Sequence, residues 1–448
     1  MTSEAFVYLM LPATTEFVTS GRFVLATDRA GIPFGRFVYG RSYLERSDAV
    51  PIDPVELPLS DQTYETTRLK GMFGAIRDAG PDYWGRRVIE KRSGVTALGE
   101  LDYLLHSPDD RAGALGFGTA REPPAPLRIY NRTMDLEHLQ ALADKVIAEE
   151  ASDADAAEIK QVEDLLLLGT SMGGARPKTV VEDEEQLWLA KFNRQDDPFN
   201  HARVEHAMLV LARECGVSSA ESRVTQIGSR DVLLVKRFDR IPAGHGAYRR
   251  ARMLSALTLL RRGDSHQDRE RWSYVLLAEE LRRVSREPKE DASELFRRMT
   301  FSALISNTDD HPRNHAVIAP HQTFRLSPAY DLIPHPQVSV ERRDLALAIG
   351  DCGRHANAEN LISQSQRFLL ERAEAARIID QMEACVRARW YAVARREGVT
   401  EQDCEKISRA FVYEGFRPAP LARATGVGGG TRDPAGVRVP RGARVPPR

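Results

Sequence analysis

The sequence of 448 residues is poor in cysteine and has no long hydrophobic run. Its four cysteines are widely separated and form no CxxC pair, which predicts neither a disulfide framework nor a cysteine-based zinc site. The four leucines at 165–168 fall far short of the roughly 20 apolar residues that cross a bilayer. The first residues include Glu4 and no basic cluster, unlike a secretory signal. We therefore expect a cytoplasmic protein that does not contact a membrane.

Neither sign of charge dominates the sequence. The 63 Lys and Arg residues nearly balance 64 Asp and Glu residues, for a net charge of −1. This balance argues against a dedicated nucleic-acid binder, whose affinity comes from many phosphate contacts. Hydrophobic residues (42%) and charged residues (28%) occur at ordinary frequencies for a globular protein. Because the length exceeds what one core usually serves, we expect two or three packed units.

The amino-terminal part, residues 1–125, resembles a β-rich unit of short strands and turns. A turn at 28–31 separates two β-rich runs. One helix is expected at 81–91, with Pro81 at its first position because that residue needs no intrahelical N–H partner. Gly94 is expected to end this helix.

The rest of the chain divides into three predicted parts. Residues 126–240 are expected to form a mixed α/β unit, which opens with a helix at 134–150 and a linker at 151–157. Residues 241–424 are expected to be mostly helical. From 425 to 448 the chain is rich in Gly, Pro and Arg and has almost no large apolar side chain, which predicts a disordered basic tail.

The most informative segment is the DxxxxN loop, residues 305–315, with the sequence ISNTDDHPRNH. It follows a predicted helix and precedes a β-like run. Asp309 and Asn314 are five residues apart, as in kinase catalytic loops, where the Asp accepts a hydroxyl proton and the Asn reaches a metal ion. A polar Asx-rich turn is the structural alternative. A zinc site from the histidines at 311, 315 and 321 is another, although the HxxxH pattern lacks a neighbouring Glu.

Asp331 lies in the apolar segment SPAYDLIP, 17 residues after Asn314. A buried carboxylate without a partner is costly, so it should meet a cation. Kinases place their second metal ligand at this point of the chain, and Mg²⁺ prefers oxygen ligands. The alternative is an Asp that caps the turn before Pro334.

Lys191 lies on the return strand of a predicted hairpin, with the turn at 182–186. Strand alternation places Lys191 on one face with Leu187 and Leu189, so its stem can cover an apolar cleft while its ammonium meets phosphate. Glu205, on a helix predicted at 201–214, is placed to hold Lys191, as a kinase helix glutamate does. A surface lysine is the alternative.

Two further segments fit a nucleotide site. The glycine-rich segment 169–178, GTSMGGARPK, permits close backbone approach to an anion, although it matches neither the Walker A nor the GxGxxG pattern. The segment 231–240 is expected to be a buried strand that ends in charge, where a kinase hinge would run and its backbone would pair with adenine. Along the chain the six features follow the order that phosphoryl transfer in a kinase requires.

These residues resemble the HipA family of serine/threonine kinase toxins, which belong to type II toxin–antitoxin systems. The resemblance rests on GGARPK, LAKF, KRFDR, NTDDHPRNH and SPAYDLIP, and on the amino-terminal stretch FGAIRDAGPDYWGRR. It implies an α+β fold, with a protein-kinase-like two-lobed core and an amino-terminal β-rich subdomain. The core would consist of a mixed α/β N-lobe and a mostly helical C-lobe.

The resemblance also implies ATP and Mg²⁺ as cofactors and a role for each matching residue. Asp309 is expected to be the catalytic base, and Asn314 and Asp331 the metal ligands. Asp310, where the best-known member has glycine, is a second candidate base. Ser171 corresponds to the autophosphorylated loop serine, and its phosphate would add about −1.5 to −2 charge where the nucleotide must approach. The residues expected to contact the nucleotide are Met172, Gly173, Gly174, Ala175, Lys191, Glu205, Lys236, Phe238 and His311.

The function implied is phosphorylation of a Ser or Thr hydroxyl on a protein substrate, a class that includes aminoacyl-tRNA synthetases. The usual partner is a small DNA-binding antitoxin, so DNA would be contacted only indirectly. Two alternatives remain open at this point. One is a kinase-shaped co-repressor that acts with an antitoxin without catalysis. The other is a small-molecule phosphotransferase, since those enzymes also use DxxxxN.

Overall fold

The computed structural model describes residues 4–95, 98–148, 176–336 and 339–417. The predicted linker at 151–157 and the predicted disordered tail at 425–448 lie outside these residues. Cys215, Cys352, Cys385 and Cys404 are free thiols, which confirms that the chain has no disulfide framework. None of the helices within the described ranges is long and apolar enough to cross a membrane.

The amino-terminal region, residues 4–118, builds a five-stranded antiparallel sheet in the order β4-β3-β2-β1-β5. The turn predicted at 28–31 joins β2 and β3, because the Asp28 carboxylate accepts hydrogen bonds from the backbone N–H groups of Ala30 and Ile32, both at 2.8 Å. The strands are β1 (Glu4–Met10), β2 (Phe17–Thr27), β3 (Pro33–Tyr39), β4 (Tyr64–Thr66) and β5 (Leu115–Gly118).

The described part of this region contains more helix than the single one predicted. Its helices are α1 (Arg41–Leu44), η1 (Arg68–Lys70), α2 (Gly74–Asp78), α3 (Tyr83–Ser93) and α4 (Glu100–His106). The predicted place of Pro81 was wrong, since Pro81 lies before α3. Asp82 is the N-cap instead, because its carboxylate accepts a hydrogen bond from the Gly85 N–H at 2.8 Å. Gly94 ends the helix in the left-handed conformation (φ 66°), as predicted.

A second five-stranded sheet forms the N-lobe, in the order β6-β7-β8-β10-β9, with β6 and β7 parallel and the other pairs antiparallel. The predicted hairpin is β7–β8. Its turn is tighter than expected, because Glu184 and Glu185 both take positive φ (49° and 59°), which suits a two-residue hairpin loop. The strands are β6 (Asn131–Arg132), β7 (Lys178–Asp183), β8 (Gln186–Phe192), β9 (Ser222–Ile227) and β10 (Arg230–Lys236).

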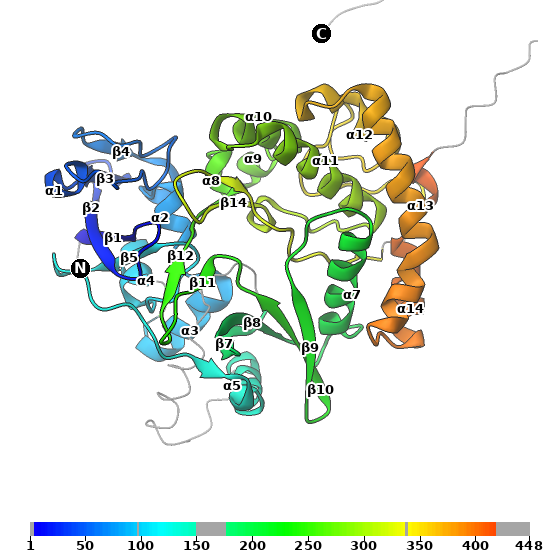
Figure 1. Ribbon diagram of the computed structural model, residues 1–448, viewed down its shortest axis with the longest axis horizontal. Helices are drawn as coiled ribbons and strands as arrows, with labels where there is room; N and C mark the ends of the chain where they lie inside the picture. Colours follow the sequence, from blue (N-terminus) through cyan, green and yellow to red (C-terminus); the bar gives the residue numbers. More distant parts are fainter. Residues whose placement is uncertain (1–3, 96–97, 149–175, 337–338, 418–448) are drawn as a thin grey trace, which may run out of the picture. The chain divides into compact units, whose positions relative to one another are not determined.

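The two faces of this sheet pack against different helices, as the alternation along β8 predicted. Trp188, Ala190 and Phe192 join one apolar cluster with residues of α3 and of α5 (Leu136–Ala148), which follows the turn η2 (Thr133–Asp135). Figure 1 shows α3 and α5 beside β7 and β8. Leu187 and Leu189 face the other way, on the side of the sheet that meets α7 (His201–Glu214). The boundaries proposed at residues 125, 240 and 424 stay predictions, and α3 packs across the first of them.

The C-lobe is mostly helical, as predicted, and carries a small antiparallel sheet, β13-β14-β15. In two of its helices the start is marked by the sequence, since Ser273 caps α10 (Tyr274–Val284) and Pro288 opens α11 (Pro288–Leu304). The strands are β11 (Arg240–Pro242), β12 (Tyr248–Arg250), β13 (Arg252–Ser255), β14 (Ala316–Ala319) and β15 (Arg325–Leu326). The helices are α8 (Ala256–Leu259), α9 (His266–Arg269), α10 (Tyr274–Val284), α11 (Pro288–Leu304), η3 (Pro312–Asn314), α12 (Ala358–Ser363), η4 (Ser365–Phe368), α13 (Arg372–Arg396), α14 (Glu401–Ile407), η5 (Ser408–Ala410) and η6 (Glu414–Phe416).

A buried ion pair joins the amino-terminal region to the N-lobe sheet. Lys178 Nζ lies 2.7 Å from Asp82 Oδ2, and the two side chains are 1% and 5% exposed. The backbone carbonyl of Lys178 also accepts a hydrogen bond from the Trp84 indole N–H at 3.2 Å. The first turn of α3 is therefore held to the start of β7 by both charge and hydrogen bonding.

Replacing Lys178 with methionine should destabilise the protein by about 3–5 kcal/mol, because the Asp82 carboxylate then stays buried without its counter-charge. The loss is measured as a lower midpoint of thermal unfolding. Lys406→Met is the matched control: Lys406 pairs with Asp403 at 3.1 Å but is 41% exposed, so its loss should cost at most about 1 kcal/mol. Equal midpoints for the two variants would contradict the role given to the buried pair.

Candidate active site

One cleft brings together most of the predicted site residues that the structure describes. Lys191 reaches it from β8, Lys236 from the end of β10 and Phe238 from the segment that follows. Asn314 reaches it from the DxxxxN loop, and Asp331 from the segment after β15. The apolar part of its wall consists of Leu189, Val235, Met253 and Tyr330. The cleft therefore has an apolar side next to the hinge segment, residues 237–239, and a charged side formed by Lys191 and Asp331.

The ammonium of Lys191 lies between two carboxylates. Lys191 Nζ is 2.6 Å from Glu205 Oε1 and 2.9 Å from Asp331 Oδ1. Burial opposes the ionised form of Asp331, but the charge of Lys191 outweighs it and lowers the pKa of Asp331 to about 2. Burial likewise opposes the charge on Lys191, but the two carboxylates raise its pKa above the usual value. Lys191 and Asp331 are thus both ionised at neutral pH. The cation that the sequence required for Asp331 is Lys191.

Asp331 has an unusual backbone conformation. Its φ of 60° lies in the left-handed region, which residues with a side chain seldom adopt. Strained residues of this kind gather at functional sites, where the surrounding structure holds them in place. Here Lys191 binds the side chain, and the neighbouring Tyr330 hydroxyl donates to the carbonyl of Arg313 at 2.8 Å. The segment that carries Asp331 is thereby tied to the DxxxxN loop.

Within the DxxxxN loop, Asp309 and Asn314 are linked through the backbone. The Asn314 amide donates to the carbonyl oxygen of Asp309 at 3.3 Å, across the turn η3, and the Asp309 side chain is exposed. His311 lies outside the cleft: it lines an adjacent groove, and its Nδ1 accepts a hydrogen bond from the Arg313 N–H at 3.2 Å.

The second candidate base, Asp310, is buried and fully engaged. Its Oδ1 lies 2.8 Å from His315 Nε2, and the Tyr274 hydroxyl donates to Oδ2. Burial raises the pKa of Asp310, but His315 and the hydrogen bonds to Tyr274 and Ser302 outweigh it and hold the pKa below 3.8. Asp310 therefore anchors the loop to α10, while the side chain of its neighbour Asp309 is accessible from solvent. These contacts also engage His315, which leaves the three histidines of the zinc alternative in separate surroundings.

Within the described ranges, no three His, Cys, Asp or Glu side chains form a group that could hold a metal ion by themselves. An Asn–Asp pair completed by phosphate and water oxygens is a different kind of site. Asn314 and Asp331, which line the same cleft, supply the hard oxygen donors that such a site needs.

The glycine-rich segment lies largely outside the described residues, and with it Ser171, Met172, Gly173, Gly174 and Ala175. Its last part is described: Arg176 makes a two-pronged ion pair with Asp197, at 2.7 and 2.8 Å. The carboxylate of Asp197 also accepts the Arg194 N–H at 2.8 Å. The end of the segment next to β7 is thereby fixed to the loop after β8.

Comparison with known proteins identifies the family. A family model described as the HipA-like C-terminal domain matches residues 170–390, and one described as the HipA N-terminal domain matches residues 20–118. The chain belongs to the HipA family. The resemblance found in the sequence is confirmed, and so is the predicted α+β, kinase-like two-lobed fold.

A solved HipA structure shows the same fold as this HipA-family chain. HipA of Shewanella oneidensis MR-1, solved with HipB and its operator DNA, superposes with a TM-score of 0.65 at 18% identity, over 91% of this chain and 94% of that one. The proinflammatory kinase CtkA of Helicobacter pylori gives a TM-score of 0.36 at 12% identity, over 55% of this chain and 91% of that one. A Haemophilus influenzae protein described as a candidate kinase is 24% identical over 190 residues, which are 38% of this chain. The match spans 55% of that relative's length.

The HipA amino-terminal region supplies part of the cleft, which the sequence reasoning missed. Asp78, Gly80, Asp82 and Ala112 line the cleft together with the residues of the two lobes. Asp78 is held there by the Ser255 and Thr258 hydroxyls, each donating at 2.7 Å. No local spacing or periodicity marks these residues. The signal for Asp78, Gly80 and Asp82 was the FGAIRDAGPDYWGRR stretch, which was quoted for the family resemblance alone, and Ala112 lies outside it.

A groove adjoins the cleft on the far side of Arg313. Asp82 and Arg313 line both hollows, and His311 lies in the groove. Asp264 bridges Arg313, at 2.7 Å, and Arg77 of the amino-terminal region. Tyr83, at 66% exposure, also lines this groove. The groove is thus polar, and the amino-terminal region forms one of its walls.

Replacing Asp310 with asparagine should lower the thermal unfolding midpoint at neutral pH, with a loss of about 3 kcal/mol, because the buried carboxylate that binds His315 and the Tyr274 hydroxyl is lost. Asp309→Asn is the matched control and should change the midpoint little, since its side chain is exposed. The ionised Asp310 stabilises the fold above its ordinary pKa of 3.8, and this contribution is lost as the pH falls through its lower folded-state pKa. The difference between wild type and Asp310→Asn should therefore shrink in acid. A larger loss for Asp309→Asn would contradict the assignment.

Proposed function

We propose that this chain is an ATP-dependent serine/threonine protein kinase of the HipA type. The observation that supports it best is the position of Lys191, which pairs with Glu205 and Asp331 in a cleft that Asn314 also lines. A lysine held by a helix glutamate, beside an Asp and an Asn, is the arrangement that phosphoryl transfer in kinases uses. The activity, the substrate and the role of each residue are part of this proposal.

The nucleotide base would lie against the hinge segment. Phe238 and Tyr330 have ring centroids 5.6 Å apart, and Leu189, Val235 and Met253 add apolar surface to the same wall. Lys236 lies at the entrance, where its Nζ is 3.0 Å from Glu221 Oε2. An apolar wall beside the hinge segment suits a purine ring, and the charged side of the cleft would receive the phosphates.

The charged side would position the phosphates and their metal ion. Lys191 would contact the phosphates, and Glu205 keeps its ammonium in place. Asn314 and Asp331 would hold Mg²⁺, whose charge offsets the negative charge on the transferred group. Because Asp331 stays ionised, with a pKa of about 2, it keeps its ligand charge throughout the physiological pH range.

Asp309 would act as the base that accepts the proton of the attacking hydroxyl. Its carboxylate is exposed, and it lies two positions before His311, which lines the groove with Arg313, so an incoming hydroxyl can reach it. We place the acceptor segment of the protein substrate in this groove. A groove lined mainly by charged and polar side chains suits a polypeptide better than the closed pocket expected of a small-molecule phosphotransferase.

Regulation and partners complete the proposal. Ser171 would be the autophosphorylation site, and its phosphorylation would inactivate the enzyme. The protein substrates would include aminoacyl-tRNA synthetases. The Shewanella HipA structure contains HipB and operator DNA. For this chain we propose a small DNA-binding antitoxin as partner, with DNA contacted only through it, and action in the cytoplasm as a toxin.

Asp309→Asn should reduce ³²P incorporation from labelled ATP by about 10²–10⁴-fold, the usual contribution of a general base. Nucleotide binding should persist, because Asp309 does not line the cleft. Asp61→Asn, another exposed aspartate, should keep wild-type incorporation. EDTA should abolish incorporation by wild type, and Mg²⁺ should restore it. Equal incorporation by wild type and Asp309→Asn would remove Asp309 from the role of base.

Phosphopeptide mass spectrometry after expression in cells should identify both the protein substrate and the autophosphorylation site. Peptides containing phosphorylated Ser171 should appear with wild type and be absent with Asp309→Asn, because transfer requires the base. Antitoxin-dependent promoter repression without any difference in phosphopeptides would favour the co-repressor function instead.

A further inference from the structure

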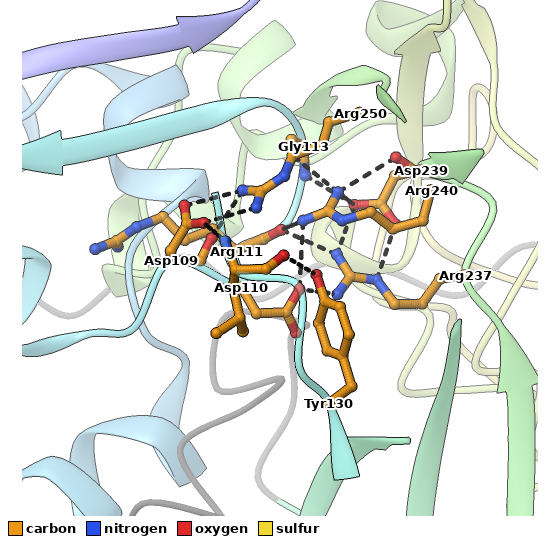
Figure 2. A network of polar contacts seen from close by, with 10 residues as sticks. Asp109, Asp110, Arg111, Gly113, Tyr130, Arg237, Asp239, Arg240 and Arg250 are labelled. Carbon is orange, nitrogen blue, oxygen red and sulfur yellow. Dashed lines mark hydrogen bonds and ion pairs between the residues drawn. The ribbon is translucent and has the colours of Figure 1, made fainter. Parts of the chain in front are cut away.

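The hinge segment, residues 237–239, is held by side chains and carbonyl groups of the amino-terminal region. Figure 2 shows the contacts, in which Arg237 and Arg240 point toward residues 109–113. The KRFDR stretch was interpreted as part of a nucleotide site, but the side chains of its two arginines and its aspartate also bind this network. Their function therefore needs a separate explanation.

Arg237 joins three partners at once. Its Nε and Nη2 bind the two carboxylate oxygens of Asp239 at 3.0 and 2.9 Å, and Nη2 also donates to the carbonyl of Arg111 at 3.0 Å. Its Nη1 forms an ion pair with Asp110. The planar guanidinium fixes direction as well as distance, so these bonds leave Arg237 one position.

Arg240 and Gly113 close the network from both sides. Arg240 Nη1 donates to the Gly113 carbonyl at 2.9 Å and to Asp239 Oδ2 at 2.8 Å, and Arg240 Nη2 lies 3.4 Å from Asp110 Oδ1. In the reverse direction, the Gly113 N–H donates to Asp239 Oδ2 at 2.9 Å. Hydrogen bonds therefore run from the hinge to the amino-terminal region and back.

These charges are almost completely buried. The side chains of Asp110, Arg237 and Arg240 are 0%, 2% and 1% exposed. Buried charges tolerate little displacement, because a lengthened ion pair leaves an unsolvated charge behind. The segment 109–113 is itself anchored, since Arg111 donates to the carbonyls of Ala79 at 3.0 Å and Ser107 at 2.9 Å. The hinge is thus attached to a rigid support.

A shift of the hinge would reach the metal-ligand segment. The Arg237 N–H donates to the Leu187 carbonyl at 2.8 Å, and the Asp239 carbonyl accepts from the Ala251 N–H at 3.0 Å. Phe238, between these two bonds, contacts the ring of Tyr330, the residue before Asp331. Moving Arg237 or Asp239 would therefore move both the purine wall and the neighbour of Asp331.

We infer that Asp110 is a positioning residue for nucleotide binding, which acts through Arg237 on the hinge backbone. The inference rests on the proposed function, because the hinge is taken to contact the purine. It makes the amino-terminal region a working part of the nucleotide site and not a separable module.

The test compares two neighbouring aspartates that each pair with a buried arginine. Asp110 pairs with the hinge residue Arg237. Asp109 pairs with Arg250, at 2.8 Å, and Arg250 belongs to β12 and does not line the cleft. Asp110→Asn and Asp109→Asn make the same chemical change in both. Binding of a fluorescent ATP analogue with Mg²⁺ is measured by titration, and thermal unfolding is followed on the same samples.

Asp110→Asn should weaken binding of the analogue by about tenfold or more, whereas Asp109→Asn should stay within about twofold of wild type. In turnover, Asp110→Asn should raise KM for the nucleotide by a larger factor than it lowers kcat, because Arg237 acts on the purine wall directly and on Asp331 only through Tyr330. Arg237→Lys should retain only part of the wild-type affinity for the analogue, since the ammonium of lysine cannot replace the planar guanidinium of arginine.

The other outcomes each decide against the inference. Equal affinity of wild type and Asp110→Asn would overturn it, and so would equal losses for the two asparagine variants, which would indicate general destabilisation. If the Asp110→Asn variant does not fold and the Asp109→Asn variant does, the role of Asp110 is structural. If the wild-type protein does not bind the analogue at all, the proposed function itself is contradicted. Failure of the proposed function is thereby distinguished from failure of the inference about Asp110.

Discussion

The ion pairs of Lys191 with Glu205 and Asp331 are the interaction on which the candidate site depends. They connect a strand of the N-lobe sheet, the helix packed on that sheet and a C-lobe segment that follows the third sheet. A lysine with a single carboxylate partner would tie together only two of these elements. With two partners it holds Asp331 in a left-handed conformation that an aspartate rarely adopts. The same charges keep Asp331 ionised, so the site keeps its polarity although it is largely shielded from water.

Buried charge also explains why the amino-terminal region is closely integrated with the lobes. Asp82 pairs with Lys178 at the start of β7, and Asp110 pairs with Arg237 at the hinge. Each pair joins two different parts of the chain and lies outside the hydrogen-bonding ladder of either sheet. Both require exact placement of two parts of the chain, because a buried charge is costly unless its partner lies in hydrogen-bonding range. Charge pairs thus determine how the amino-terminal region is placed against the cleft, while apolar contacts of α3 supply much of the packing.

The neighbouring aspartates 309 and 310 of the DxxxxN loop differ in burial and in contacts although they are adjacent in the sequence. Asp310 turns inward to His315 and Tyr274, whereas the Asp309 side chain is exposed. The inward residue fixes the loop and the exposed one remains available for a hydroxyl.

The sequence by itself determined the features that depend on local periodicity and order. The alternation in β8 placed Lys191 on the face opposite Trp188, the helix 201–214 was located correctly, and the order of the motifs indicated a kinase-like cleft. The tertiary structure alone decided which of the aspartates 309 and 310 is exposed, and that Asp78, Gly80, Asp82 and Ala112 line the cleft. The reason is physical: a short-range pattern records which face a residue takes, but the partner of a buried charge lies wherever the fold brings it. Asp110 and Arg237 are 127 positions apart, and no local pattern links them.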